Sequence, residues 1–530
     1  MMDKVVTRAK AQSRIKRNAF QAADLFQRSR GLLIALLFIA AFVVRLYHID
    51  APPLNFHATR QYRSLIISRG FYFQMANPVP AWVKSVALTS QQRQGILEPP
   101  IMEGIVAAGY VLLGGERLWL PHLLSTLFWL IGGVFLYMLA RSTADVGAAV
   151  VAVVFYLFLP FAVVASRSFQ PDPLMIMLLL ACLWAIWHYY QARTNEAPTT
   201  ARLVTATIFS ALAFMVKPGS LFVLAGAFLA LAVFQDGIWR GLLNKNVFLF
   251  LFFVVMPTLA VYAYGAITRT FLIGEAEKTV IPSLLLTPFF WLGWIGNISS
   301  TVGYIAFFAA LLGVFIFRPG APRAFLVGLW IGYVAFCLTL NYNVATHDYY
   351  QLMLVPIAAL SLAPLVMIVL RQALAQHPEW YWRSALGGIL LAALAITLAS
   401  SVVKLNEGSG DAAKQVQIEA NIGELVNHST QTIFLADDYG VSLEYHGLMS
   451  GKPWPLSSDL EWERLTRAEG QSAAERFQTL FASESPDYFI VLDRSEFQKQ
   501  PDLQAFLNEN YPILAQNDDY LIFNLRHRKS

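Results

Sequence analysis

Charged residues are scarce in this sequence. They make up 14% of its 530 residues, whereas about 25% is usual in soluble domains, and 56% of the residues are hydrophobic. The mean hydropathy is +0.50. Such a composition excludes an ordinary soluble protein and predicts a polytopic α-helical membrane protein.

Cysteine is nearly absent as well. The two cysteines, Cys182 and Cys337, both lie inside apolar runs. This excludes a disulfide framework, and we expect both side chains to be buried as small hydrophobic groups. The sequence also has no internal repeat, no low-complexity tract and no glycine-rich loop of the kind that cradles phosphates.

Positive charge is concentrated at the N-terminus. Eight basic residues lie between Lys4 and Arg30, and the net charge of the chain is +5. This predicts a basic cytoplasmic tail over residues 1–30 that faces anionic lipid, rather than a nucleic-acid partner. No small-residue cleavage site follows the apolar run from Gly31 to Val44, so we expect a retained first span with Arg45 snorkelling to the interface.

Apolar runs recur along the first 403 residues. A spanning helix needs roughly 20 apolar residues, fewer when its ends snorkel. The sequence then predicts eleven spans, at 31–47, 118–140, 147–165, 174–190, 203–216, 220–234, 247–267, 298–317, 324–340, 351–370 and 385–403. We expect residues 101–115, which carry Glu103, and the stretch that begins at Leu284 to lie at the interface or to re-enter the membrane.

The charges in the loops orient these spans. If the N-terminus is inside, nine basic residues lie in short inner loops and four lie outside. The inner residues are Arg141, Arg193, Arg202, Arg240, Lys245, Arg318, Arg323, Arg371 and Arg383, and the outer ones are Arg167, Lys217, Arg269 and Lys278. This bias predicts a cytoplasmic N-terminus and an outer C-terminus.

The composition becomes polar after Val403. The stretches "QTIFLA", "DYFIVLD" and "YLIFNLR" are typical of short strands, and "AAERFQTLFA" is typical of a helix between them. We therefore predict a membrane domain over residues 31–403, with an outer loop at 48–117 that contains interfacial helices. A periplasmic α/β domain over residues 404–530 follows it.

Polar side chains collect at the predicted outer ends of the spans. The candidate site residues are His57, Arg60, Gln61, Arg63, Glu98, Arg167, Asp172, Lys217, His347, Asp348 and Tyr349. Each also has a purely structural interpretation: Lys217 as a turn anchor, Asp172 as a helix N-terminal carboxylate, Arg69 as a snorkelling residue. Together they suit an anionic lipid substrate, because Arg and Lys hold a phosphate while a carboxylate or an imidazole moves a proton.

Four stretches carry a resemblance to a known group of enzymes. They are "RLYHIDAPPLNFHATRQYR", "EPPIMEGIVAAGYVLLGG", "RSFQPDPLM" and "THDYYQLMLVP". In this order they resemble the GT-C glycosyltransferases, specifically the bacterial relatives of protein O-mannosyltransferases and of the aminoarabinose transferase that acts on lipid A. The resemblance covers roughly residues 31–403 and makes this the catalytic domain.

The resemblance implies an inverting hexosyl- or pentosyltransferase. Such an enzyme moves a sugar from a polyprenyl-phosphate donor to a lipid, glycan or protein acceptor on the periplasmic side of a bacterial inner membrane. A general base takes the proton of the acceptor hydroxyl, and positive charge stabilises the departing phosphate. No nucleotide site is needed, which agrees with the missing glycine-rich loop.

The sequence departs from the family at the expected catalytic carboxylate. Members usually carry Asp-Glu in the first outer loop, where this chain has His57-Ala58. We therefore expect His57 to act as the base together with Glu98, Asp172 or Asp348, since an imidazole exchanges protons near neutral pH.

The other candidate residues are expected to bind the substrate. Arg60 and Lys217 are the first choices for the phosphate, with Arg167 and Arg63 after them. Gln61 and Tyr349 are expected to bind sugar hydroxyls. His57, Glu98, His347 and Asp348 are suitable ligands for a divalent metal, but no ligand spacing supports one, and no cofactor is predicted.

Three other functions fit the sequence less well. An O-antigen polymerase or ligase usually has a large outer loop between late spans instead of a terminal α/β domain. A secondary transporter or lipid flippase usually has paired halves and ionisable residues at mid-membrane, neither of which is found here. A sensor or scaffold would not need eleven spans as its anchor.

Overall fold

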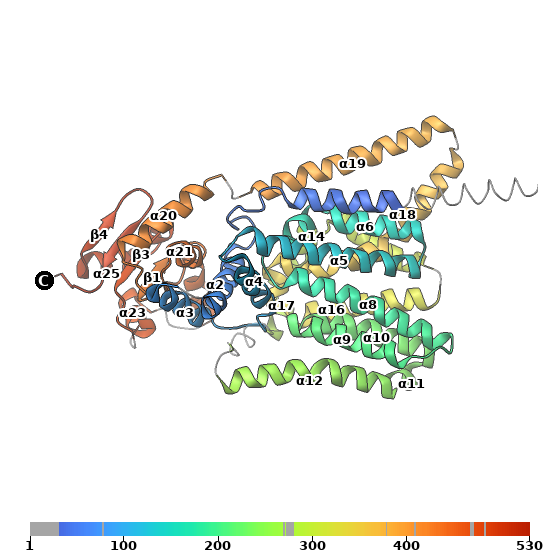
Figure 1. Cartoon of the computed structure of the whole chain (residues 1–530), viewed down its shortest axis with the longest axis horizontal. Coiled ribbons are helices and arrows are strands. Elements are labelled where there is room, and N and C mark those ends of the chain that lie inside the picture. Colours follow the sequence, from blue (N-terminus) through green and yellow to red (C-terminus); the bar gives the residue numbers. More distant parts are fainter. Residues whose placement is uncertain are drawn as a thin grey trace, which may run out of the picture.

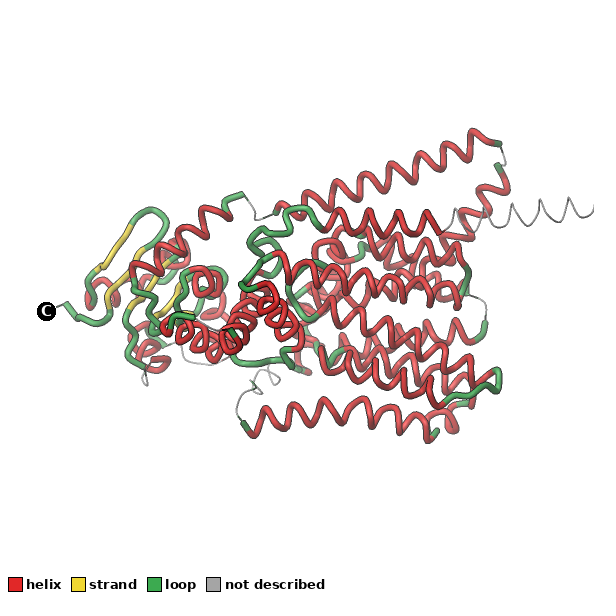
Figure 2. The backbone as a smooth tube through the Cα atoms, viewed as in Figure 1, coloured by secondary structure: helices red, strands yellow, loops and turns green. Residues whose placement is uncertain are grey.

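The computed structural model describes residues 31–76, 79–268, 271, 280–317, 319–377, 379–407, 410–466, 471–481 and 484–529. The predicted tail at 1–30 and the loop residues Arg269, Lys278 and Arg318 lie outside the described residues. The described chain forms a helical bundle with a smaller α/β domain at one end (Figures 1 and 2).

Six helices of the bundle are long and apolar enough to cross a membrane. They are α5 (Trp119–Thr143), α8 (Asp172–Thr194), α11 with α12 (Ile238–Ile267), α16 (Ala321–Thr339), η2 with α18 (Asp348–Gln376) and α19 (Trp380–Asn406). A seventh span results if α14 (Pro288–Thr301) and α15 (Tyr304–Ile316), which meet at 92°, are counted as one. Shorter apolar helices are Gly31–Arg45, α4 (Ile101–Leu113), α6 (Val146–Phe158), α9 (Thr200–Val216) and α10 (Ser220–Asp236).

The predicted spans fall on these apolar helices, but two of them are interrupted: 298–317 crosses the break between α14 and α15, and 147–165 is broken after α6. Within 147–165, α6 ends at Phe158, and Pro160 begins the short helix α7 (Pro160–Ala165). Proline has no N–H to continue the helical hydrogen bonds, and its fixed φ suits the first turn of a new helix. The polypeptide therefore changes direction before it reaches the loop that contains Arg167.

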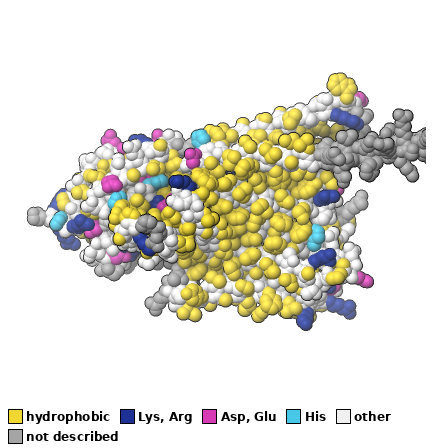
Figure 3. All heavy atoms as spheres, in the orientation of Figure 1, with side chains coloured by type: hydrophobic (Ala, Val, Ile, Leu, Met, Phe, Trp, Pro, Cys, Tyr) yellow, Lys and Arg dark blue, Asp and Glu magenta, His cyan; other side chains and the backbone are white. Residues whose placement is uncertain are grey.

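The bundle presents an apolar surface between two polar ends. Figure 3 shows hydrophobic side chains over the middle of the molecule, with the charged side chains gathered toward both ends. Glycines let the inner helices pack closely: a Cβ atom at Gly226 of α10 would lie 2.3 Å from the carbonyl oxygen of Gly328 in α16. Close approach at small residues is the usual way in which helices associate in lipid. As expected, Cys182 and Cys337 are unpaired and buried in this bundle.

Three helices stand between the bundle and the α/β domain. They are α2 (Ala58–Met75), α3 (Ala81–Gln94) and α4, and α2 packs against both of the others (Figure 1). These helices follow the first loop, where the sequence predicts interfacial segments. They connect the bundle to the α/β domain.

The C-terminal region is a five-stranded sheet with helices on both faces, as the sequence predicts. The strand order is β2 (Gly451–Pro453), β1 (Thr432–Leu435), β3 (Tyr488–Val491), β5 (Leu521–Asn524) and β4 (Ile513–Gln516). Strand β1 is parallel to β2 and β3, whereas β5 is antiparallel to β3 and β4. The strands expected in "QTIFLA", "DYFIVLD" and "YLIFNLR" are β1, β3 and β5.

The helices of this domain pack on the sheet in two layers. They are α20 (Ala412–Leu425), α21 (Val441–His446), α22 (Ser457–Thr466), α23 (Ala473–Phe481), α24 (Arg494–Gln498) and α25 (Pro501–Asn510). Alternate strand residues enter separate cores: Ile433 and Phe489 lie on the side of α25, and Phe434 and Ile490 lie on the side of α20. Helix α21 faces the bundle and contacts α2.

Candidate active site

Five segments that are distant in sequence meet at the end of the bundle nearest the α/β domain. They place His57 and Arg60 at the start of α2, Glu98 between α3 and α4, Asp172 at the start of α8, Lys217 after α9, and His347, Asp348 and Tyr349 at the start of η2. Six of these side chains form three pairs: His57 with Asp348, Arg60 with Glu98, and Lys217 with Asp172. We refer to these six residues as the polar cluster.

The first pair joins an imidazole to a carboxylate. The Nε2 atom of His57 lies 2.6 Å from Oδ1 of Asp348, and both side chains are 27% exposed. His57 is the N-cap of α2 and has a φ of 48°, in the left-handed region that non-glycine residues seldom adopt. Such backbone conformations often occur at functional sites, where the surroundings enforce them.

The second pair joins Arg60 to Glu98. One guanidinium nitrogen, Nη2, donates to both carboxylate oxygens of Glu98, at 3.3 and 3.2 Å. Burial opposes the charge on Arg60, but Glu98 raises the pKa of this guanidinium above its ordinary value. Burial likewise opposes ionisation of Glu98, but Arg60 and then Lys217 lower the pKa of this carboxyl below its ordinary value. Both groups are therefore charged at neutral pH.

The third pair is the most deeply buried. The Nζ atom of Lys217 donates to Oδ1 of Asp172 at 2.7 Å, and the two side chains are 7% and 2% exposed. Lys217 also lies over the rings of Tyr349 and Tyr350, at 4.9 and 4.4 Å from their centroids. Asp172 occupies the first turn of α8, where the helix dipole favours a negative charge. Its second oxygen, Oδ2, is buried without a hydrogen-bond partner among the described residues.

Tyr349 lies between two of the three pairs, His57–Asp348 and Lys217–Asp172. Its ring stacks edge-on with His57, with 4.7 Å between centroids, and its other neighbours include Lys217 and His347. His347 lies 6.1 Å from His57 by ring centroids and is bonded through Nδ1 to the Thr346 hydroxyl at 2.7 Å. Burial, followed by the charges of His57 and Arg60, lowers the pKa of His347 to about 4. His347 is therefore neutral at neutral pH.

Comparisons with known proteins concern the family and the fold of the chain. Residues 98–264 match the family model of dolichyl-phosphate-mannose-protein mannosyltransferases. The fold resembles that of ArnT from Cupriavidus metallidurans, solved with undecaprenyl phosphate, with a TM-score of 0.57 at 14% identity over 93% of this chain and 98% of that one. This chain therefore resembles the GT-C glycosyltransferases in its fold.

A second GT-C structure is similar to this chain over much of its length. The oligosaccharyltransferase AglB from Archaeoglobus fulgidus, solved with an inhibitory peptide and a dolichol-phosphate, gives a TM-score of 0.52 at 12% identity over 90% of this chain and 72% of that one. No curated protein is significantly similar in sequence. At these identities the two structures establish the fold, and the roles of individual residues depend on the geometry of the site.

Three of the predicted binding residues form hydrogen bonds to the main chain of loops beside the polar cluster. Gln61 is 1% exposed; it donates to the Phe56 carbonyl at 2.6 Å and accepts from the Phe169 amide at 2.8 Å. Arg167 donates to the carbonyls of Tyr47 and His48. Arg63 donates to the carbonyls of Gln94 and Gly95, at 2.5 and 3.2 Å. The structure thus places all three where they fix the loops that carry His57, Glu98 and Asp172.

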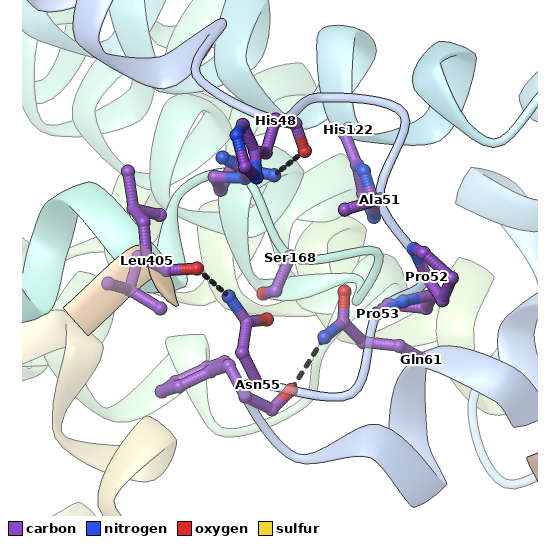
Figure 4. A pocket seen from close by; sticks show the side chains of 12 residues that line it. His48, Ala51, Pro52, Pro53, Asn55, Gln61, His122, Ser168 and Leu405 are labelled. Atoms are coloured by element: carbon purple, nitrogen blue, oxygen red, sulfur yellow. Dashed lines mark hydrogen bonds between the residues drawn. The ribbon is translucent and has the colours of Figure 1, made fainter. Parts of the chain in front are cut away.

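Gln61 and Arg167 also line a small cavity beneath the first loop. Figure 4 shows Gln61 with His48, His122 and Ser168 around this cavity, whose volume is about 20 Å³. This is room for about one water molecule, so the cavity is not a sugar-binding pocket.

Arg45 and Arg69 are not the snorkelling residues that the sequence suggests. Arg45 is fully buried and donates to the Ser166 hydroxyl and to the carbonyls of Ala41 and Leu157, because the end of α6 leaves carbonyls without helical partners. Arg69 pairs with Glu116 at 3.0 Å and donates to the carbonyl of Tyr445 in the α/β domain. Both predictions were wrong because tertiary partners replaced the lipid interface.

The sequence analysis missed two residues at this end of the bundle. Tyr350 lies under Lys217. Gln170 is 1% exposed, and neither atom of its amide has a hydrogen-bond partner among the described residues. Only the fold reveals such burial. In the part of the chain that is described, no group of three or more His, Cys, Asp and Glu side chains is arranged to hold a metal ion.

Arg193, a basic residue of a predicted inner loop, lies at the opposite end of the bundle. Helix α8 begins at Asp172 and contains Arg193 in its last turn, roughly 30 Å away at 1.5 Å per residue. Arg193 pairs there with Asp236 at 3.0 Å. The polar cluster and these residues are therefore separated by about the thickness of a bilayer core.

Proposed function

We propose that this protein transfers a sugar from a polyprenyl-phosphate donor to an acceptor hydroxyl. The observation that carries the proposal is the convergence of two cations and an imidazole–carboxylate pair at one end of a membrane bundle. The family match over residues 98–264 and the polyprenyl phosphates bound by the two similar structures support it. The sugar is a hexose or a pentose, and the acceptor is a lipid, a glycan or a protein.

His57 is the general base in this proposal. Since the Asp348 carboxylate can only accept a hydrogen bond, Nε2 of His57 carries the proton between them. The Nδ1 atom is then unprotonated and takes the proton of the acceptor hydroxyl, while Asp348 stabilises the imidazolium that forms. The acceptor oxygen bonds to the anomeric carbon as the bond from that carbon to the phosphate oxygen breaks, which inverts the configuration.

Arg60 and Lys217 stabilise the departing phosphate. The phosphate oxygen takes the electron pair of the broken bond, so negative charge grows there in the transition state. Arg60 is 19% exposed and can turn part of its guanidinium to a phosphate while Glu98 holds its position. Lys217 is 7% exposed and acts as a fixed charge beneath the site. Glu98 and Asp172, both predicted as catalytic, serve as the counter-ions of these cations.

The proposed orientation places the site on the periplasmic side of a bacterial inner membrane. The N-terminus is then cytoplasmic, and the α/β domain is periplasmic. This orientation rests on the excess of basic residues in the loops at the opposite end of the bundle. In it, His57 and Arg60 meet the carrier phosphate at the level of the outer headgroups.

Consumption of the donor tests the proposal without knowledge of the acceptor. The purified protein is incubated with a radiolabelled polyprenyl-phosphate sugar and a membrane extract, and release of the polyprenyl phosphate is measured. We expect His57→Ala to slow this release by about 10²- to 10⁴-fold, the usual effect of losing a general base. Arg371→Ala, which removes an exposed arginine paired with Asp145, is the control and should match the wild type. No release by the wild-type protein, or full release by His57→Ala, would refute the assignment.

We expect His347 to contribute no charge to the site. Because burial lowers the pKa of His347 to about 4, its imidazole carries no charge above pH 5.5. His347→Gln should therefore keep the same pH profile of donor consumption above pH 5.5, with a rate within about threefold of the wild type. Rates of both proteins measured from pH 5.5 to 9 check this. A profile that loses its acidic limb in His347→Gln would instead make His347 the base.

A further inference from the structure

Helix α2 links the polar cluster to the α/β domain. Its first turn carries His57 as the N-cap and Arg60, and its later turns face α21. The Tyr62 hydroxyl lies 2.9 Å from Nε2 of His446, and the Arg69 guanidinium lies 3.7 Å from the centroid of the Tyr445 ring. An α-helix is stiff over this length, so a displacement of α21 is transmitted to Arg60.

The other half of the Arg60–Glu98 pair is tied to the same short helix. Glu98 follows the C-terminal end of α3, where the Gln94 amide donates to Oε2 of Glu444 at 2.6 Å. The main chain at the same place is held by Arg63 of α2, which donates to the carbonyls of Gln94 and Gly95. The segment that carries Glu98 is therefore fixed both to α2 and to α21.

Three consecutive residues of α21 therefore contact the two helices that hold the Arg60–Glu98 pair, α2 and α3. Glu444 binds the end of α3, while Tyr445 and His446 bind α2. Glu444 is 3% exposed and also accepts from the Ser450 hydroxyl at 2.7 Å. Burial, and then the charge of Arg69, lowers the pKa of His446 to about 3, so its ring is neutral when it shares a hydrogen bond with the Tyr62 hydroxyl.

We propose that the segment Glu444–His446 of the α/β domain is a positioning element that sets the separation of Arg60 and Glu98 and so prepares the phosphate site. The proposal rests on the function proposed above and adds a role for the α/β domain in it. These residues touch no substrate. They act through α2 and α3. Two of the three residues, Glu444 and Tyr445, are buried.

The test separates positioning from chemistry by comparing KM with kcat. Glu444→Ala releases Gln94 and leaves the residues of the polar cluster unchanged. We expect the KM for the polyprenyl-phosphate sugar to rise about tenfold or more, since a misplacement of 1 Å costs up to about 100-fold. The value of kcat should fall less than KM rises. Glu444→Gln, which keeps an acceptor for Gln94 and a second polar group for Ser450, should restore KM to within about threefold.

Lys414→Ala is the matched control in the same domain, because Lys414 forms an exposed ion pair with Asp519 at 2.8 Å. It should leave KM and kcat unchanged. If Glu444→Ala does not fold, Tyr62→Phe replaces it, since this variant removes only the hydroxyl that bonds His446. An unchanged KM in whichever of the two variants folds would overturn the proposal. Failure of the wild-type protein to consume the donor would instead overturn the proposed function.

Discussion

Replacing Arg60 by alanine should reduce kcat/KM for donor consumption by on the order of 10²- to 10³-fold, the usual effect of removing one donor to a developing negative charge. Arg60 is partly exposed and is oriented by Glu98 through two hydrogen bonds. Its loss removes a cation from the departing phosphate and leaves the Glu98 carboxylate without its main partner. Kinetics with a radiolabelled donor check the change.

Two further variants show whether the effect belongs to the guanidinium. Arg60→Lys keeps the charge but loses the planar fork that binds two oxygens at once, so it should recover only part of kcat/KM. Glu98→Gln keeps the cation but weakens its orientation, and it should impair donor consumption less than Arg60→Ala does. A full rate in Arg60→Ala would mean that the phosphate binds elsewhere.

Replacing Lys217 by methionine should destabilise the protein by about 3–5 kcal/mol, because it leaves the charge of Asp172 buried without a partner. The pair is joined by a hydrogen bond of 2.7 Å, and the Asp172 side chain is 2% exposed. The second oxygen of Asp172 has no partner that could share the charge among the described residues. Thermal unfolding of the purified protein, followed by tryptophan fluorescence, measures the loss.

The double variant separates the structural role of this pair from its role in catalysis. Lys217→Met with Asp172→Asn removes both charges, so most of the lost stability should return. Donor consumption should stay low, because the positive charge beneath the phosphate is still missing. A double variant that is both stable and fully active would show that Lys217 is only a structural residue. Lys217→Met with wild-type stability would show that the buried pair does not exist in solution.

The membrane fold could be predicted because it depends on local composition. Apolar runs long enough to span lipid are readable in any sequence, and the predicted spans fall on apolar helices, although only six or seven of the described helical segments are long enough to cross a membrane. The break between α6 and α7 was not predicted, although Pro160 marks it. Strands β2 and β4 were also missed, because β2 has three residues and β4 is an edge strand with an exposed pattern. Short elements carry too little periodicity to be recognised.

The proximity of six of the predicted residues could be anticipated from the sequence, but the pairing among them could not. The sequence places His57, Arg60, Asp172 and Lys217 at the same ends of their helices, and the structure brings them together. Which carboxylate serves which base or cation depends on tertiary packing: Asp348 lies 291 residues from His57, whereas Glu98 is nearer in sequence and pairs with Arg60.

Gln61 and Arg167 show the limit of arguments from residue type. A polar residue in a loop near an active site suits a substrate as well as it suits a main-chain carbonyl. Only the hydrogen bonds decide, and here Gln61 joins Phe56 to Phe169 while Arg167 holds Tyr47 and His48. Buried main-chain groups must find partners, and these side chains supply them.

The most direct test is a structure of this protein with a polyprenyl phosphate bound in a lipid nanodisc. The account predicts the phosphate within hydrogen-bond distance of the Arg60 guanidinium and on the side of the bundle that contains Lys217, with His57 facing the position of the sugar. A phosphate bound at the opposite end of the bundle, near Arg193 and Asp236, would contradict the account.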